Sequence, residues 1–171
     1  MELDRSMKVT DLSRDQDWYW FSWRQLGTTA RAAAAGRPGT RLKSIDLPAG
    51  YEARLLQTQR DCERIRGDWE RLAGSMPHPS SFMTWDFQLT WWRHHGLSRR
   101  LLVLVLYRED RIVGIAPLMI CPKRILGVYR WRLEMLGDAS LMERPGLLTE
   151  YGDAHAENLL WQCAIGTRER W

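Results

Sequence analysis

The chain has 171 residues, of which 44% are hydrophobic and 27% charged, which is typical of one folded domain and argues against a disordered chain. The net charge is +4, but acidic and basic residues are interspersed, so no basic stripe for nucleic acid is predicted. Cys62, Cys121 and Cys163 have no CxxC spacing, which argues against a disulfide framework or metal site and favours reduced thiols in the cytoplasm.

Residues 1–47 are predicted to form an N-terminal extension, helical or poorly ordered, ahead of a domain over residues 48–171. Ser13–Gln16 has the form of a capping box, in which both side chains satisfy free backbone N–H groups. It predicts a helix over Arg14–Ala35, which the following glycine and proline end. The Gly- and Pro-containing stretch Arg37–Pro48 is then the natural linker.

A strand and two helices are predicted next. Tyr51–Gln57 has the pattern of a strand, and Thr58 is suited to cap the start of a helix. Apolar residues then recur at helical spacing, which predicts one helix that ends at Gly74. The residues of this stripe are Cys62, Ile65, Trp69 and Leu72. A second helix is predicted over Thr84–Gly96, with its histidines in the last turn, where they suit the helix dipole.

The next elements are strands. Leu101–Tyr107 is continuously apolar, as a strand covered on both faces should be, and it is too short to span a membrane. Arg111–Met119 is the return strand of a hairpin, in which Pro117 marks an edge or a bulge because it cannot donate a ladder hydrogen bond. Further elements are predicted in the strands Trp131–Leu136 and Gly146–Thr149 and in a helix over Asp153–Ile165.

Three segments together resemble a known family. DWERLAGSMPHPSSFMTWDFQLTWWRHHG carries Trp69, Leu72, Phe82, Trp85, Trp91, Trp92 and Gly96; LLVLVLYREDRIVGIAPL ends in the Gly-Ile-Ala-Pro-Leu of Gly114–Leu118; and RLEMLGDASLMERPGLL carries Leu136, Gly137, Asp138 and Pro145. This pattern resembles the GNAT-superfamily N-acetyltransferases linked to bacterial cellulose and exopolysaccharide biosynthesis, which are similar to peptidoglycan aminoacyltransferases. The resemblance covers about residues 51–171.

The resemblance implies an α/β (α+β) fold with a GNAT-like mixed, largely antiparallel sheet flanked by helices. It implies transfer of an acyl group from acetyl-CoA or another acyl-CoA to a small-molecule or saccharide amine in polysaccharide or cell-envelope biosynthesis. The family relatives have two GNAT-like halves, and the later half handles the donor. Another strand is expected where the chain ends at Trp171, so the sheet is expected to be incomplete at the C-terminus and the chain alone to lack the donor site.

The usual donor motif of the family is Gln/Arg-x-x-Gly-x-Gly/Ala at a strand-to-helix turn, where backbone N–H groups hold the pyrophosphate of coenzyme A. Arg124–Tyr129 matches its first four positions but ends in a bulky tyrosine and lies between two strands. It is therefore interpreted as an ordinary loop. His94 and His95 are adjacent on a helix and diverge, so they suit one metal ion poorly.

Candidate substrate-binding residues are Asp138, Ser140, Glu143 and Arg144, which form a polar loop after a strand end. Trp91 is added because it lies off the line of Trp85, Leu89 and Trp92 and is predicted to be exposed. No catalytic residue is identified. Two alternatives stay open: a non-catalytic module that binds a partner or a carbohydrate through its tryptophans, and a fragment without independent activity, whose exposed sheet edge invites association.

Overall fold

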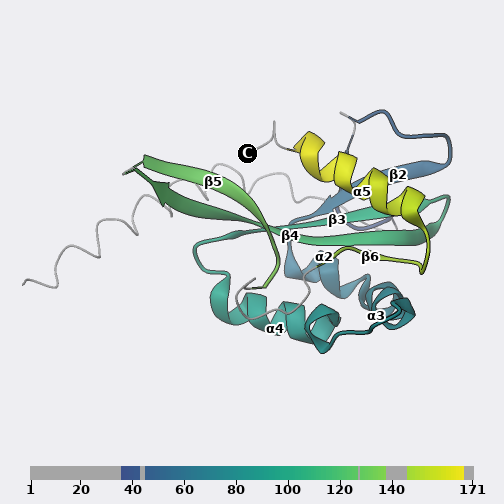
Figure 1. Ribbon diagram of the computed structural model, residues 1–171, viewed down its shortest axis with the longest axis horizontal. Helices are drawn as coiled ribbons and strands as arrows, with labels where there is room; N and C mark the ends of the chain where they lie inside the picture. The colour runs from purple at the N-terminus through teal and green to yellow at the C-terminus, as the bar shows by residue number, and fades with distance from the viewer. Residues whose placement is uncertain (1–35, 43–44, 127, 138–145, 168–171) are drawn as a thin grey trace, which may run out of the picture. The chain divides into compact units, whose positions relative to one another are not determined.

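The structure, a computed structural model, describes residues 36–42, 45–126, 128–137 and 146–167. Apart from Gly36, these residues belong to a compact unit that begins at Arg37. The helix predicted over Arg14–Ala35 lies outside the described residues and stays a prediction. The α+β fold is confirmed: helices pack on a six-stranded antiparallel sheet (Figure 1).

Five strands of the sheet lie side by side in chain order, and the sixth pairs with the fourth. Their bounds are β1 (Thr40–Arg41), β2 (Tyr51–Leu56), β3 (Arg100–Arg108), β4 (Arg111–Ile125), β5 (Val128–Met135) and β6 (Leu148–Thr149). Each of the pairs is antiparallel. The predicted hairpin is formed by β3 and β4, which turn at Glu109 and Asp110.

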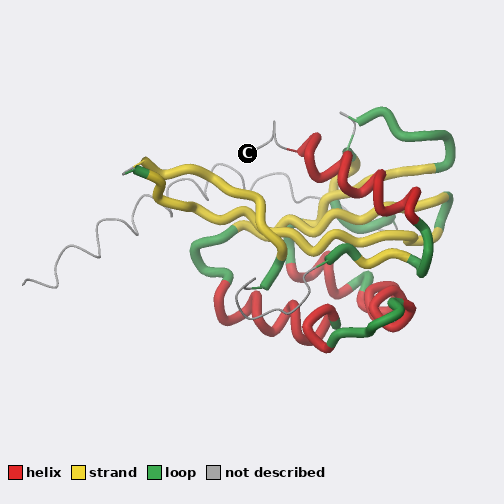
Figure 2. The backbone as a smooth tube through the Cα atoms, viewed as in Figure 1, coloured by secondary structure: helices red, strands yellow, loops and turns green. Residues whose placement is uncertain are grey.

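The two faces of the sheet are covered by different helices (Figures 1 and 2). On one face lie α2 (Gln59–Glu63), α3 (Arg66–Ser75), the short 3-10 helix η2 (Ser81–Met83) and α4 (Trp85–His95). On the other lies α5 (Ala154–Gly166), which packs through Leu159, Leu160 and Cys163. Successive side chains of a strand point to opposite faces. This explains why β3 is apolar at every position of its central run. Val103 and Val105 face the first group of helices, and Leu104 faces α5.

The helix predicted from Thr58 to Gly74 is interrupted. Thr58 caps α2 as expected, with its hydroxyl accepting from the Asp61 N–H, but α2 ends at Glu63 and α3 begins at Arg66. At the break the Cys62 carbonyl accepts from the Ile65 N–H at 3.2 Å, a tighter turn than an α-helix makes. The same carbonyl accepts from Nε1 of Trp85 at 3.1 Å. The break therefore supplies an acceptor for a buried indole of α4.

A second indole fixes the loop between α3 and α4. Nε1 of Trp69, a fully buried side chain, donates to the Met83 carbonyl at 2.9 Å. The amide of Gln88, on the first turn of α4, donates to the Phe82 carbonyl at 2.7 Å. Thr84 caps α4 through its hydroxyl and Gly96 ends it, as predicted. The tryptophans of this segment therefore act as core residues that also satisfy loop carbonyls.

Pro117 marks the point where β4 changes its partner. β4 pairs with β6 at Gly114 and Ile115, and with β5 from Leu118 onward. Between them the Pro117 carbonyl accepts from the Leu136 N–H at 2.7 Å. The N–H and C=O groups of one extended residue point to the same side, so the missing donor of Pro117 faces this gap. Pro117 therefore lies in a central strand of the sheet, whereas the sequence predicts that it marks an edge or a bulge.

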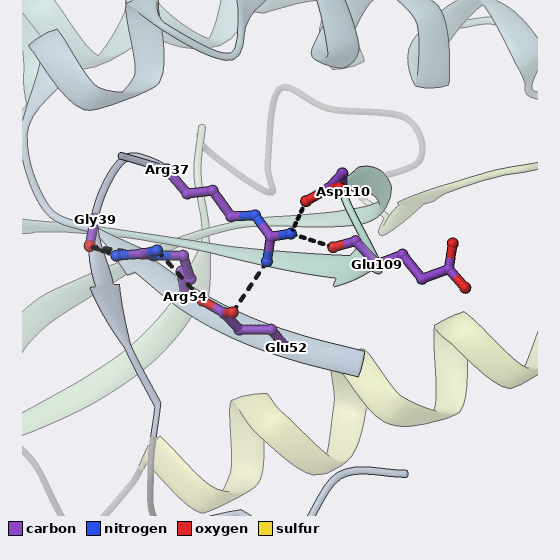
Figure 3. Close-up of polar contacts among 6 residues, drawn as sticks. All are labelled: Arg37, Gly39, Glu52, Arg54, Glu109 and Asp110. Atoms are coloured by element: carbon purple, nitrogen blue, oxygen red, sulfur yellow. Dashed lines mark hydrogen bonds and ion pairs between the residues drawn. The ribbon is translucent and has the colours of Figure 1, made fainter. Parts of the chain in front are cut away.

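The prediction that Arg37–Pro48 is a linker is wrong for the first part of this segment, which packs on the sheet. β1 pairs with β2, and Leu42 and Pro38 are buried. Figure 3 shows why: the Arg37 guanidinium bonds Glu52 at 3.0 Å and Asp110 at 2.5 Å and also reaches the Glu109 carbonyl. The charges that clamp this segment lie on β2 and on the β3–β4 turn, far away in sequence.

Gly39 is the residue of this segment that tolerates substitution least. Its φ is +81°, and an added Cβ would lie 2.4 Å from the Leu55 carbonyl oxygen. Its own carbonyl accepts two hydrogen bonds from Arg54, at 2.7 and 3.3 Å. We expect Gly39→Ala to lower the free energy of unfolding by about 1–2 kcal/mol, measured by urea denaturation. Gly36→Ala is the control, because an added Cβ at this position meets no atom within 4 Å apart from its chain neighbours. Equal losses of unfolding free energy in both variants would contradict the close packing of Gly39 against β2.

Candidate functional site

The polar loop predicted to contact substrate, with Asp138, Ser140, Glu143 and Arg144, lies outside the described residues, and its role stays a prediction. The structure does fix the residues on either side. Leu136, before the loop, and Leu148, after it, are fully buried. Both lie at the gap beside Pro117, because Leu136 bonds the Pro117 carbonyl and Leu148 pairs with Ile115.

The prediction that Trp91 is exposed is wrong. Trp91 is buried, with 9% of its surface exposed, and it belongs to the core under α4. Its indole lies against the His95 ring at 5.1 Å and under the Arg99 guanidinium at 5.2 Å. The inward face of α4 is rotated from the predicted one because Gln88, a polar residue, is fully buried through its bond to the Phe82 carbonyl.

The two other segments weighed for chemistry also have structural roles. His94 and His95 lie exposed at the end of α4, with ring centroids 6.4 Å apart and at 59°. Arg124 and Tyr129 are cross-strand partners near the tip of the β4–β5 hairpin. The interpretation of Arg124–Tyr129 as an ordinary loop is therefore wrong: β4 runs through Ile125 and β5 begins at Val128, so the segment is the end of a hairpin and is followed by a strand, not by a helix N-terminus that could hold a phosphate.

The turn between β6 and α5 is the best candidate site among the described residues. It comprises Glu150–Asp153 and joins a strand directly to the N-terminus of a 13-residue helix. Sequence reasoning missed it, although Thr149–Ala154 (TEYGDA) matches the Gly and Ala positions of the donor motif at Gly152 and Ala154. Gly152 has a φ of +78°, and nothing crowds its Cβ position. The backbone of this turn is therefore open to close approach.

Glu150 is held by two arginines from distant elements. Its Oε1 lies 3.1 Å from the guanidinium of Arg71, on α3, and 2.6 Å from that of Arg111, on β4. Arg71 also bonds Asp68 at 2.9 Å and the Ile112 carbonyl at 2.6 Å. This network joins α3, β4 and the β6–α5 turn. Arg71 and Glu150 are partly exposed and Arg111 is 60% exposed, and ion pairs of this kind fix geometry more than they add stability.

The charges of the turn nearly cancel. Arg71, Arg108 and Arg111 approach it, and the Arg108 guanidinium lies 3.6 Å from Asp153. Hydrogen bonding to Tyr51 raises the pKa of Arg108, with a further contribution from the nearby carboxylates. The carboxylates Asp68, Glu150 and Asp153 balance these cations. The turn consequently offers no net positive field to a polyanion.

The N-terminus of α5 is already capped. Oδ1 of Asp153 accepts from the Ala156 N–H at 2.9 Å, and its carbonyl accepts from the Glu157 N–H at 3.2 Å. A helix N-terminus binds phosphate through such free N–H groups. Here the Asp153 carboxylate occupies one of them, the Ala156 N–H, and its negative charge would repel a pyrophosphate. The side chains of this turn therefore do not fit the pyrophosphate of coenzyme A, although its backbone has the required shape.

Comparison with known proteins supplies no further guide to the site. No helix among the described residues is long and apolar enough to cross a membrane. The chain matches no protein-family model, no curated protein and no solved structure.

Proposed function

We propose that this chain is the N-terminal part of a GNAT-type N-acyltransferase and supplies the scaffold and part of the acceptor cleft. The observation that carries the proposal is the order of the elements around the sheet. Strand β2 is followed by helices α2–α4, the β3–β4 hairpin and strand β5, and β2, β3 and β4 are antiparallel neighbours. This order of strand, helices, hairpin and strand resembles the opening of the GNAT acyltransferase fold.

The reaction would transfer an acyl group from acetyl-CoA or another acyl-CoA to an amine. The amine nitrogen attacks the thioester carbonyl, the C–S bond breaks, the thiol leaves and the amine loses a proton. The acceptor would be a small molecule or a saccharide in polysaccharide or cell-envelope biosynthesis. The predicted polar loop between Leu136 and Leu148 would contact it.

The chain alone is expected to bind the donor poorly, since Asp153 caps the helix at the turn that resembles the donor motif. We expect calorimetric titration with acetyl-CoA to give no micromolar binding. Asp153→Ser keeps a capping oxygen and removes the negative charge, so this variant is expected to bind more tightly than the wild type. Clear micromolar binding by the wild-type chain would overturn the inference that the donor site is missing.

The carbohydrate-binding alternative loses its main support. Trp131 and Trp161 are exposed, but they lie on different elements, β5 and α5. Trp85 and Trp91 of α4 are buried and Trp92 is half-buried, and such residues contribute packing and not a stacking platform for sugars. Acyl transfer is therefore the function that the described geometry supports best.

The proposal is tested by an acyl-transfer assay. An extended chain, which includes any residues that the gene encodes after Trp171, is incubated with acetyl-CoA and glucosamine. The thiol released from acetyl-CoA is measured. N-acetylglucosamine, whose nitrogen is already acylated, is the control acceptor. We expect thiol release with glucosamine from the extended chain only.

A further inference from the structure

The hairpin formed by the distal parts of β4 and β5 projects from the sheet, beyond the described helices that cover its two faces (Figure 2). We name the described residues Pro122–Leu126 and Val128–Leu133 the β4–β5 arm. Its register pairs Pro122 with Trp131 and Ile125 with Val128. Leu133, at its base, packs against the core on the α5 side, and the described helices do not extend over the rest of it (Figure 2). The arm is therefore a separate surface feature that the acyltransferase proposal does not use.

Exposed apolar side chains are concentrated on this arm. Leu126, at its tip, is 99% exposed, and Val128 and Tyr129 are each more than half exposed. Trp131 is 44% exposed. Isolated exposed apolar residues need no explanation, but a cluster at the end of a projecting hairpin indicates an interaction surface.

The arm is also basic. Lys123, Arg124, Arg130 and Arg132 are exposed, and the sequence contains no Asp or Glu from Arg111 through Leu133. One of these cations, Arg132, is paired, with Glu134 at 3.3 Å. Such an excess of positive charge on one hairpin complements an anionic surface.

Both faces of the ribbon carry basic side chains, and the aromatic side chains lie on one of them. Directly paired residues point to the same face. Lys123 therefore shares one face with its partner Arg130, and Pro122 shares the other with Trp131. The Arg124 guanidinium lies 6.0 Å from the Tyr129 ring on this second face.

This arrangement selects the class of partner. A nucleic-acid strand binds by stacking its bases on aromatic rings beside basic side chains, and it would leave unused the tip residue Leu126, which is 99% exposed, and the basic side chains of the other face. A second copy paired at the β5 edge would bring like charges together. If the arm inserts into a bilayer with its tip first, both of its faces contact lipid. The aliphatic tip then lies deepest, and the aromatic and basic side chains lie at the level of the headgroups.

The dimensions agree with such an insertion. Trp131 and its partner Pro122 lie three residue pairs behind Val128 and Ile125. At about 3.3 Å per residue this is about 10 Å of strand. Apolar groups of interfacial segments enter the headgroup region to about 5–10 Å. Leu126 can therefore reach the acyl boundary while Trp131 stays at the membrane interface.

We propose that the β4–β5 arm binds the surface of an anionic lipid bilayer, with Leu126 entering the interface and Lys123 and Arg130 contacting lipid headgroups. The arm thereby attaches the protein to a membrane without spanning it. This proposal rests on the arm alone and holds whether or not the chain belongs to an acyltransferase.

Co-sedimentation of the full chain with vesicles tests the proposal. We expect binding to vesicles that contain phosphatidylglycerol, weak binding to phosphatidylcholine alone, and weakening as salt is raised. K123Q/R130Q is expected to lower the affinity about fivefold for each charge removed. L126S is expected to lower it about tenfold, because one buried leucine is lost from the interface.

Matched controls keep the outcomes distinct. R41Q/R60Q removes two exposed arginines elsewhere, and L97S removes an exposed leucine outside the arm. Both controls are expected to bind like the wild type, and circular dichroism checks that every variant is folded. The proposal is overturned by absence of binding, by equal losses in arm and control variants, or by tighter binding to a poly(U) oligonucleotide than to the vesicles.

Discussion

Trp69→Ala is expected to lower the free energy of unfolding by about 3–5 kcal/mol, the usual cost of truncating a buried aromatic to alanine. Trp69 is fully buried in the core between the sheet and α3. The variant creates a cavity and also leaves the Met83 carbonyl without its indole donor. Because a domain has only about 5–15 kcal/mol of stability, this loss is a large share of the total.

Urea denaturation followed by circular dichroism measures this loss. Trp161→Ala is the matched control, since this tryptophan lies on α5 with 46% of its surface exposed. Its loss is expected to be small, because little buried area is removed. Trp69→Phe separates the two contributions, since it keeps most of the packing and removes the hydrogen bond. Equal effects of Trp69→Ala and Trp161→Ala would contradict the assignment of Trp69 to the core.

Alkaline pH is expected to destabilise the fold through its buried thiols. Burial, with smaller contributions from Asp61 and Glu63, raises the pKa of Cys62 from 9.0 to about 12, and burial raises that of Cys163 to about 11. Below pH 9.0 both thiols are neutral in both states. Above it the unfolded thiols lose their protons while the folded ones keep them, which favours unfolding.

The loss runs from pH 9.0 to about 11 for Cys163 and to about 12 for Cys62. Each thiol contributes a slope of about 1.4 kcal/mol per pH unit within its window. Urea titrations at increasing pH measure the slope. Cys62→Ala and Cys163→Ala should each flatten the decline. An unchanged slope in both variants would show that these thiols do not cause it.

The sequence predicted the elements whose residues carry their own periodic signal. The unbroken apolar run of β3 required a cover on both faces, and helices lie on both. The spacing of Trp69 and Leu72 placed one helix face correctly. Thr58, Thr84 and Gly96 act as helix caps because capping depends on nearby backbone groups.

Features that depend on distant partners were not predictable in this way. The break after Cys62 supplies an acceptor to Trp85, 23 residues away. Arg37 was assigned to a linker because its partners Glu52 and Asp110 lie on other elements. Trp91 was predicted to be exposed because nothing in the sequence indicates that Gln88 is buried.

The candidate site was the least predictable part. Glu150 meets Arg71 and Arg111 only after α3, β4 and the β6–α5 turn have come together. One local signal was present, the Gly-x-Ala of Gly152–Ala154 ahead of a helix. The segment that matches more positions of the donor motif, Arg124–Tyr129, lies on the arm and not ahead of a helix.

Thiol release from acetyl-CoA in the presence of glucosamine, by the chain extended through the codons that follow Trp171, tests the proposed acyltransferase most directly. We predict amine-dependent release from the extended chain and none with N-acetylglucosamine. An extended chain that binds no acetyl-CoA, or that releases no more thiol with glucosamine than with N-acetylglucosamine, would contradict the account.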